Sequence, residues 1–184
     1  MSFIELSKER FSVRKFEQKK VEQAKIDLIL EVARLAPTAV NYQPQRILVL
    51  DKEESYERFK QCTPYHFNAP LVFLICYDKI SAWKDQSNKD NGFIDASIIT
   101  THMMYAAQEL GLGSTWVGSF DYDKVRDLFE IPEYLEPAAF LVMGYPIKDI
   151  RPSKMHYDRL PLEKIAFVDS FAGIEPGEEH SRDH

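Results

Sequence analysis

Three short apolar runs, each bounded by turn residues or by charge, predict buried strands at residues 46–50, 71–77 and 138–143. Apolar side chains recur at helical spacing between residues 22 and 35. Pro37 ends that helix, because proline disfavours helical geometry in the residue before it. Polar helices are predicted at residues 52–61 and 122–129. The strands are therefore predicted to be separated by helices.

Residues 93–110 form a longer segment that is apolar on nearly every face, with a pair of glycines at its end. A helix of this kind is normally buried all round. In a chain this small, we expect a partner subunit to cover one side of it. The elements alternate without a strict strand–helix–strand rhythm. This favours a mixed α+β sandwich, with helices flanking a sheet.

The chain beyond residue 145 is rich in proline and charge. Residues 165–168 form a short apolar island in it, which could pair as a strand with a neighbouring subunit. We expect a single domain over residues 1–170 and a solvated tail over residues 171–184.

Length and charge exclude several classes of protein. A chain of 184 residues is long enough for one filled core. Its formal charge of −6 is opposite to the usual balance of nucleic-acid-binding proteins, so no nucleic acid partner is expected. No run approaches the roughly 18 apolar residues that span a bilayer, so no membrane partner is expected. The two cysteines and five histidines lack metal-ligand spacing, which predicts no metal. No signal peptide is visible, and a cytoplasmic location is expected.

The first candidate for chemistry lies near the N-terminus, at residues 10–16 (RFSVRKF). If this stretch is extended, Arg10, Ser12 and Arg14 share one face, with Phe11 and Val13 on the other. Two guanidinium groups and a hydroxyl suit an anionic phosphate. A solvated basic strand would have the same pattern.

The second candidate is the loop at residues 36–44 (APTAVNYQP), between a predicted helix and a predicted strand. Asn41 and Gln43 both donate and accept hydrogen bonds, so they could read the edge of a planar heterocycle. A well-capped turn is the alternative.

Taken together and in this order, the two stretches resemble the nitroreductase family, with its R-x-S-x-R-x-F and A-P-[ST]-x-x-N-x-Q-P motifs. Three further segments match the family: Asp95 and the helix running into GLGSTW at residues 111–116, LVMGYP at 141–146, and DRLPLE at 158–163. The resemblance covers residues 10–168.

The resemblance implies an α+β fold with a mixed, mostly antiparallel sheet flanked by helices, in an intertwined homodimer. It also implies FMN as cofactor, NAD(P)H as hydride donor and a small-molecule acceptor. Arg10, Ser12 and Arg159 would hold the phosphate and ribityl chain, with Phe11 beside them, and Arg14 would approach the pyrimidine edge of the flavin. Residues 115–119 would lie along the isoalloxazine, with a backbone amide near Gly118 or Ser119 facing N5. The remaining expected cofactor contacts are Pro37, Thr38, Ala39, Asn41 and Gln43, largely from the second subunit, and Thr115, Trp116 and Val117.

Tyr157 stands where many members carry a second basic residue, so phosphate affinity is expected to depend more on Arg10. The implied activity is hydride transfer from NAD(P)H to a nitroaromatic or quinone, with no dedicated acid–base residue. Relatives of the same architecture also carry out reductive dehalogenation or oxygen-dependent flavin cleavage. A flavin-binding module without turnover is the alternative outside enzymes.

Overall fold

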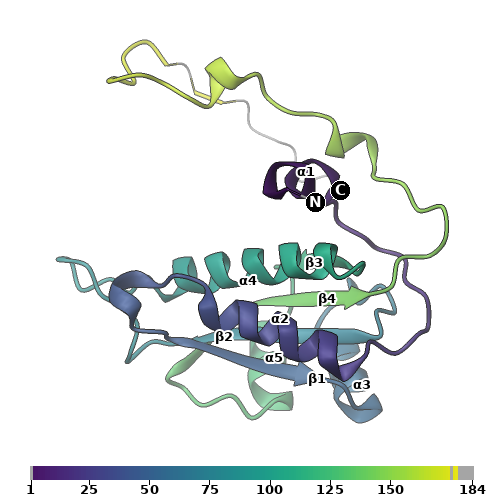
Figure 1. Ribbon diagram of the computed structural model, residues 1–184. Coiled ribbons are helices and arrows are strands. Elements are labelled where there is room, and N and C mark those ends of the chain that lie inside the picture. The colour runs from purple at the N-terminus through teal and green to yellow at the C-terminus, as the bar shows by residue number, and fades with distance from the viewer. Residues whose placement is uncertain (1, 175, 178–184) are drawn as a thin grey trace. The chain divides into compact units, whose positions relative to one another are not determined.

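The computed structural model describes residues 2–174 and 176–177, in two compact units, Met1–Pro152 and Ser153–His184. The first unit is an α+β fold (Figure 1). Its elements, in chain order, are α1 (Phe3–Glu9), α2 (Gln23–Leu35), the 3₁₀ turn η1 (Ala39–Asn41), β1 (Gln45–Leu50), α3 (Glu53–Cys62), β2 (Leu71–Asp78), α4 (Gly92–Glu109), β3 (Gly113–Val117), α5 (Tyr122–Leu128) and β4 (Leu135–Gly144).

The four strands form one sheet in the order β1-β2-β4-β3. All three ladders are antiparallel, with Ile47 opposite Ile75 in β1–β2 and Trp116 opposite Leu141 in β3–β4. The predicted α+β class and antiparallel character are confirmed. The sheet was predicted to be mixed, but no two of its four strands pair in parallel. Among the described residues, parallel pairing is limited to an isolated bridge between Ser12 and Ser114.

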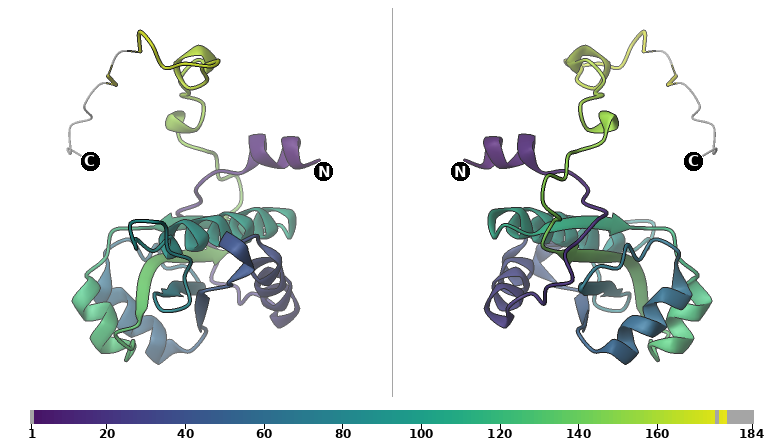
Figure 2. Two further views of the ribbon diagram at one scale, coloured as in Figure 1. Left: turned by 90° about the vertical axis from the view of Figure 1, so that its left-hand side faces the viewer. Right: turned by 90° about the vertical axis from the view of Figure 1, so that its right-hand side faces the viewer.

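Helices cover both faces of the sheet. Alternate residues of β2 divide between two apolar clusters, as the two-residue period of a strand requires. Phe73 and Ile75 pack in the cluster that contains α2 and α4, and Val72 and Leu74 pack in the cluster that contains α3 and α5. Figure 2 shows α4 on one side of the sheet and α3 and α5 on the other. The central strand β2 is therefore buried on both faces.

The predicted helices and strands are confirmed to within a few residues, and two elements were missed. The first is α1, which has a capping box in which Ser2 accepts from the Glu5 N–H and the Glu5 carboxylate accepts from the Ser2 N–H. The second is β3, a strand of five residues at the edge of the sheet. Both are short, so neither gives a periodic apolar pattern.

Within one chain α4 is buried on one side only, and the expected cover of its other side by a partner subunit stays a prediction. Ile99 and Met103 are fully buried on the side that faces the sheet, whereas Phe93 and Ile94 in the first turn are about half exposed. A sheet can cover only one side of a helix that lies across it. No described helix is long and apolar enough to cross a membrane.

The second unit contains two 3₁₀ turns, η2 (Lys154–His156) and η3 (Leu162–Lys164). In the single chain residues 165–168 do not form a strand, and their pairing with a neighbouring subunit stays a prediction. Instead, the Ile165 and Ala166 N–H groups donate back to the carbonyl of Leu162. The boundaries expected at residues 170 and 171 stay a prediction, and most of that tail (residues 175 and 178–184) lies outside the described residues.

The buried thiol of Cys76, on β2, predicts a loss of stability at alkaline pH. Burial raises its pKa from 9.0 to about 12. An unfolded chain releases this proton near pH 9 and the folded chain does not, so the stabilisation is complete below pH 9 and is lost as pH rises towards 12. Between these values, the free energy of unfolding should fall by about 1.4 kcal/mol per pH unit more in the native protein than in Cys76→Ala.

Urea unfolding at several pH values between 8 and 11 measures this difference in slope. Val72→Ala, which truncates a fully buried neighbour of Cys76 in the same cluster, should lower stability at every pH and leave the slope unchanged. Parallel pH profiles for the native protein and Cys76→Ala would contradict the prediction.

Candidate functional site

The N-terminal stretch at residues 10–16 lies along the free edge of β3. The Val13 N–H donates to the Ser114 carbonyl (3.0 Å), and the Thr115 hydroxyl donates to the Val13 carbonyl. The Val13 side chain is almost completely buried. It packs against Gly113, where any Cβ would lie 2.5–2.8 Å from three Val13 atoms. The structure thus brings Ser12 and Thr115, both predicted site residues, to one edge of the sheet.

Arg10 ends α1 and leads into this stretch. Its Nη1 atom is buried and has no hydrogen-bond partner among the described residues. A buried guanidinium nitrogen without an acceptor is costly, and an anionic oxygen is the acceptor that suits it best. A hydrogen bond from this atom to a phosphate oxygen of FMN would supply the missing acceptor, and this is the contact expected for Arg10.

Arg14 is exposed, whereas Phe11 packs partly buried against the cluster that contains Val13. The prediction that Phe11 and Val13 lie together on the apolar face of this stretch is therefore confirmed. Arg14 remains available to a ligand, and its proximity to a flavin stays a prediction.

The turn after β3 exposes two backbone amides. Val117 is buried, but Gly118 and Ser119 are exposed, and no described residue accepts a hydrogen bond from their N–H groups. Thr63, which is 3% exposed, fixes this turn by donating from its hydroxyl to the Ser119 carbonyl (2.7 Å). Sequence reasoning missed Thr63, because its partner lies 56 residues further along the chain.

The loop at residues 36–44 has an unusual backbone. Val40, Asn41 and Gln43 all have positive φ, between 51° and 58°, which residues with a Cβ rarely adopt. Inside the loop, the Gln43 N–H donates to the Thr38 hydroxyl (3.1 Å). A bond to α4 joins the Ala39 N–H to Oδ1 of Asp95 (2.9 Å). This conformation leaves Pro37, Asn41 and Gln43 exposed.

The two groups of predicted residues are held near opposite ends of α4. Ala39 is bonded to Asp95, in the first turn of the helix. At the other end, the Leu112 N–H donates to the Ala107 carbonyl just before β3 begins. A helix of 18 residues rises about 27 Å. One chain therefore does not bring loop 36–44 to the stretch at residues 10–14, and Figure 1 shows them on different sides.

Arg159 belongs to the second unit and is described within that unit only. Its Nη1 atom donates to the carbonyls of Met155 (2.8 Å) and Asp158 (2.7 Å). Its predicted contact with the phosphate stays a prediction.

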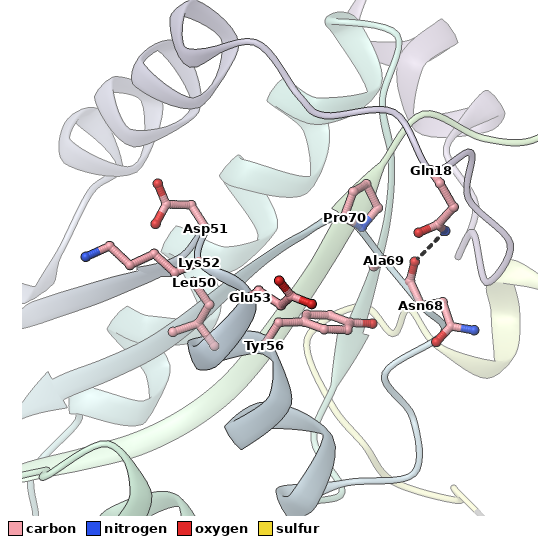
Figure 3. Close-up of a pocket in the computed structure, with 9 residues that line it drawn as sticks. All are labelled: Gln18, Leu50, Asp51, Lys52, Glu53, Tyr56, Asn68, Ala69 and Pro70. Atoms are coloured by element: carbon pink, nitrogen blue, oxygen red, sulfur yellow. Dashed lines mark hydrogen bonds between the residues drawn. The ribbon is translucent and has the colours of Figure 1, made fainter.

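A separate hollow of about 440 Å³ lies between Gln18, the end of β1, the start of α3 and residues 68–70 before β2 (Figure 3). The side chains of Asp51 and Glu53 line it, together with the ring of Tyr56. None of the predicted cofactor residues lines it, and its two carboxylates outnumber its one cation, Lys52, which disfavours a phosphate. This hollow therefore does not fit FMN. No group of described residues could hold a metal ion.

Comparison with known proteins agrees with this geometry. The sequence model of the "Nitroreductase family" matches residues 7–65 and 64–145. A protein of Methanothermobacter thermautotrophicus, named "Putative NADH dehydrogenase/NAD(P)H nitroreductase", is 32% identical over 174 residues, which is 89% of this chain and 88% of that protein.

Two solved structures share the fold. A nitroreductase family protein from Clostridium difficile 630 is 40% identical, with a TM-score of 0.88 over 92% of this chain and 99% of that one. A protein of Exiguobacterium sibiricum, solved in complex with FMN, is 23% identical, with a TM-score of 0.78 over 91% of this chain and 97% of that one.

Proposed function

Since the chain belongs to the nitroreductase family of NAD(P)H-dependent flavin oxidoreductases, we propose that it transfers hydride from NAD(P)H through FMN. The acceptor is a small molecule such as a nitroaromatic or a quinone. The observation that carries the proposal is the buried Nη1 atom of Arg10, which has no partner among the described residues and lies next to a stretch bonded to β3. The related fold from Exiguobacterium sibiricum was solved with FMN, which supports the choice of cofactor.

The residues that would hold FMN come from two chains in this proposal. Arg10, Ser12 and Arg159 bind the phosphate and ribityl chain, and Arg14 faces the pyrimidine edge. Pro37, Thr38, Ala39, Asn41 and Gln43 of a second subunit complete the site. The separation of the two groups along α4 supports this division, as do the exposed Phe93 and Ile94 on that helix. The active form is therefore a homodimer.

FMN supplies the hydride chemistry at N5, and the protein supplies binding, orientation and electrostatics. The free N–H groups of Gly118 and Ser119 suit a hydrogen bond to that nitrogen, with Thr63 holding the turn in place. Residues 115–117 would lie along the ring, with Trp116 as the half-buried side chain among them, since the side chains of Thr115 and Val117 are buried. The reaction is ping-pong, because the nicotinamide leaves before the acceptor enters the same pocket. No side chain is needed as acid or base.

An absorbance spectrum followed by anaerobic addition of NADPH or NADH tests the proposal. We expect flavin bands that bleach on addition of the nicotinamide and return when a nitroaromatic or quinone is added. A protein that neither binds added FMN nor consumes nicotinamide would contradict it.

Arg14→Ala should lower the reduction potential of the bound flavin. Reduction leaves negative charge at N1 and the C2 carbonyl, and a cation nearby favours that form. A charge pair about 4 Å apart is worth roughly 4 kcal/mol at an effective dielectric near 20, before desolvation. If about 1.4 kcal/mol of this remains, the potential falls by roughly 30 mV in the variant.

A redox titration against a dye of known potential measures the shift. Lys15→Ala removes the same charge from an exposed neighbour and should move the potential much less. Equal shifts in the two variants would show a general charge effect, contrary to the role proposed for Arg14.

A further inference from the structure

Asp95 is a buried acidic residue on α4 that carries no assigned role. It is 2% exposed. Its Oδ1 atom accepts from the Ala39 N–H at 2.9 Å, and its Oδ2 atom is buried with no partner among the described residues. We propose that Asp95 is a positioning residue, which holds loop 36–44 in the conformation that FMN binding requires. The inference rests on the proposed function, because that loop is where the second subunit would meet the flavin.

The loop needs an external restraint. Positive φ is unfavourable for any residue with a Cβ and most of all for a β-branched one, yet Val40, Asn41 and Gln43 all adopt it. Such a backbone persists only where the surroundings hold it. The bond from the Gln43 N–H to the Thr38 hydroxyl closes the loop on itself, and the bond from the Ala39 N–H to the buried carboxylate of Asp95 attaches it to α4.

Stability of the fold does not by itself explain an acidic side chain at this position. A buried carboxyl group whose second oxygen has no partner among the described residues is costly. An apolar residue in the same place would avoid that cost, but it would leave the Ala39 N–H without its acceptor. Its neighbour Ala96 and the residue one turn later, Ile99, are both fully buried and apolar. What the carboxyl group provides is an acceptor, aimed at a half-buried backbone amide of the loop.

Amide exchange in the FMN-free protein tests the restraint directly. In Asp95→Ala, the Ala39 amide should exchange at least about tenfold faster than in the native protein, because its acceptor is gone. The matched control is Thr100→Val, which removes a buried hydroxyl on the same helix that bonds only to the Ala96 carbonyl. This control should leave Ala39 unchanged. Asp95→Ser, with a hydroxyl too short to reach Ala39, replaces Asp95→Ala if that variant does not fold.

Titration with FMN then tests the role in binding. Asp95→Ala should weaken FMN binding by about tenfold or more, a change of about 1.4 kcal/mol, and should alter the visible circular dichroism of the bound flavin. Asp95→Asn keeps an oxygen for Ala39 and should restore the affinity to within a small factor. Thr100→Val should bind as the native protein does.

Unchanged Ala39 exchange in Asp95→Ala would overturn the inference, as would unchanged FMN affinity or a failure of Asp95→Asn to restore it. A native protein that binds no FMN would overturn the proposed function instead. In that case the exchange of Ala39 still decides whether Asp95 holds the loop.

Discussion

Gly113→Ala is expected to detach the N-terminal stretch from β3 and to cost both stability and FMN affinity. A Cβ at this position would lie 2.5–2.8 Å from three atoms of Val13, which is shorter than any real contact. Val13 is 1% exposed and has no room to retreat. Overpacking at such a site costs about 1–3 kcal/mol.

The same change strains two hydrogen bonds that fix the stretch. These are the bonds from the Val13 N–H to the Ser114 carbonyl and from the Thr115 hydroxyl to the Val13 carbonyl. Each contributes about 1 kcal/mol net. We therefore expect the free energy of unfolding of the FMN-free protein to fall by about 3 kcal/mol, measured by urea unfolding. FMN should bind at least about tenfold more weakly, because Arg10 and Ser12 move with the stretch.

Gly118→Ala is the matched control for stability. Its added Cβ would meet Trp116 at 3.6 Å, an ordinary contact, so stability should stay within about 0.5 kcal/mol of the native value. If Gly113→Ala is as stable as Gly118→Ala, the close approach of Val13 to β3 does not limit the fold and the prediction is wrong.

The parts of the fold that the sequence predicts are those with a strong apolar pattern. Residues 71–77 are apolar without interruption, and β2 is buried on both faces. β3 was missed because it is short and its first three residues are glycine, serine and threonine. Its position is decided by pairing with β4 and by the N-terminal stretch, and these partners are distant in sequence. For α1, the Ser2 and Glu5 pair was a usable signal, because it forms a capping box.

Some residues of the candidate site could be predicted from the sequence, and others could be found only in the folded chain. Local motifs pointed to Arg10 and Ser12, whose contacts with FMN stay a prediction. In the described part of the chain, the Nη1 atom of Arg10 has no partner and the stretch that contains Ser12 is bonded to β3, which is compatible with that role. Thr63 carries no local signal, and Asp95 was noted only as the start of a helix that resembles the family's, since each acts on a backbone group 56 residues away. Only the folded chain shows that these buried polar side chains fix the two loops of the site. Sequence motifs thus identify residues that would touch the ligand more readily than residues that position them.

Arg10→Met is expected to weaken FMN binding about a hundredfold while leaving the FMN-free protein as stable or slightly more stable. The two effects have opposite signs because the Nη1 atom of Arg10 is buried without a partner in the described structure. Without FMN, methionine fills similar space and removes an unpaired polar group. With FMN, the lost hydrogen bond to a charged phosphate is worth about 1.5–3 kcal/mol, and 2.8 kcal/mol corresponds to about a hundredfold in Kd.

Fluorescence titration with FMN and with riboflavin separates the phosphate contribution from the rest of the site. Riboflavin lacks the phosphate, so its affinity should be the same in Arg10→Met as in the native protein. Arg34→Met removes an exposed arginine paired with Glu31 on α2 and should change neither affinity. Equal losses for FMN and riboflavin in Arg10→Met would mean that Arg10 shapes the pocket rather than binding the phosphate. A fall in stability of the FMN-free protein would mean that the buried guanidinium is already paired in solution.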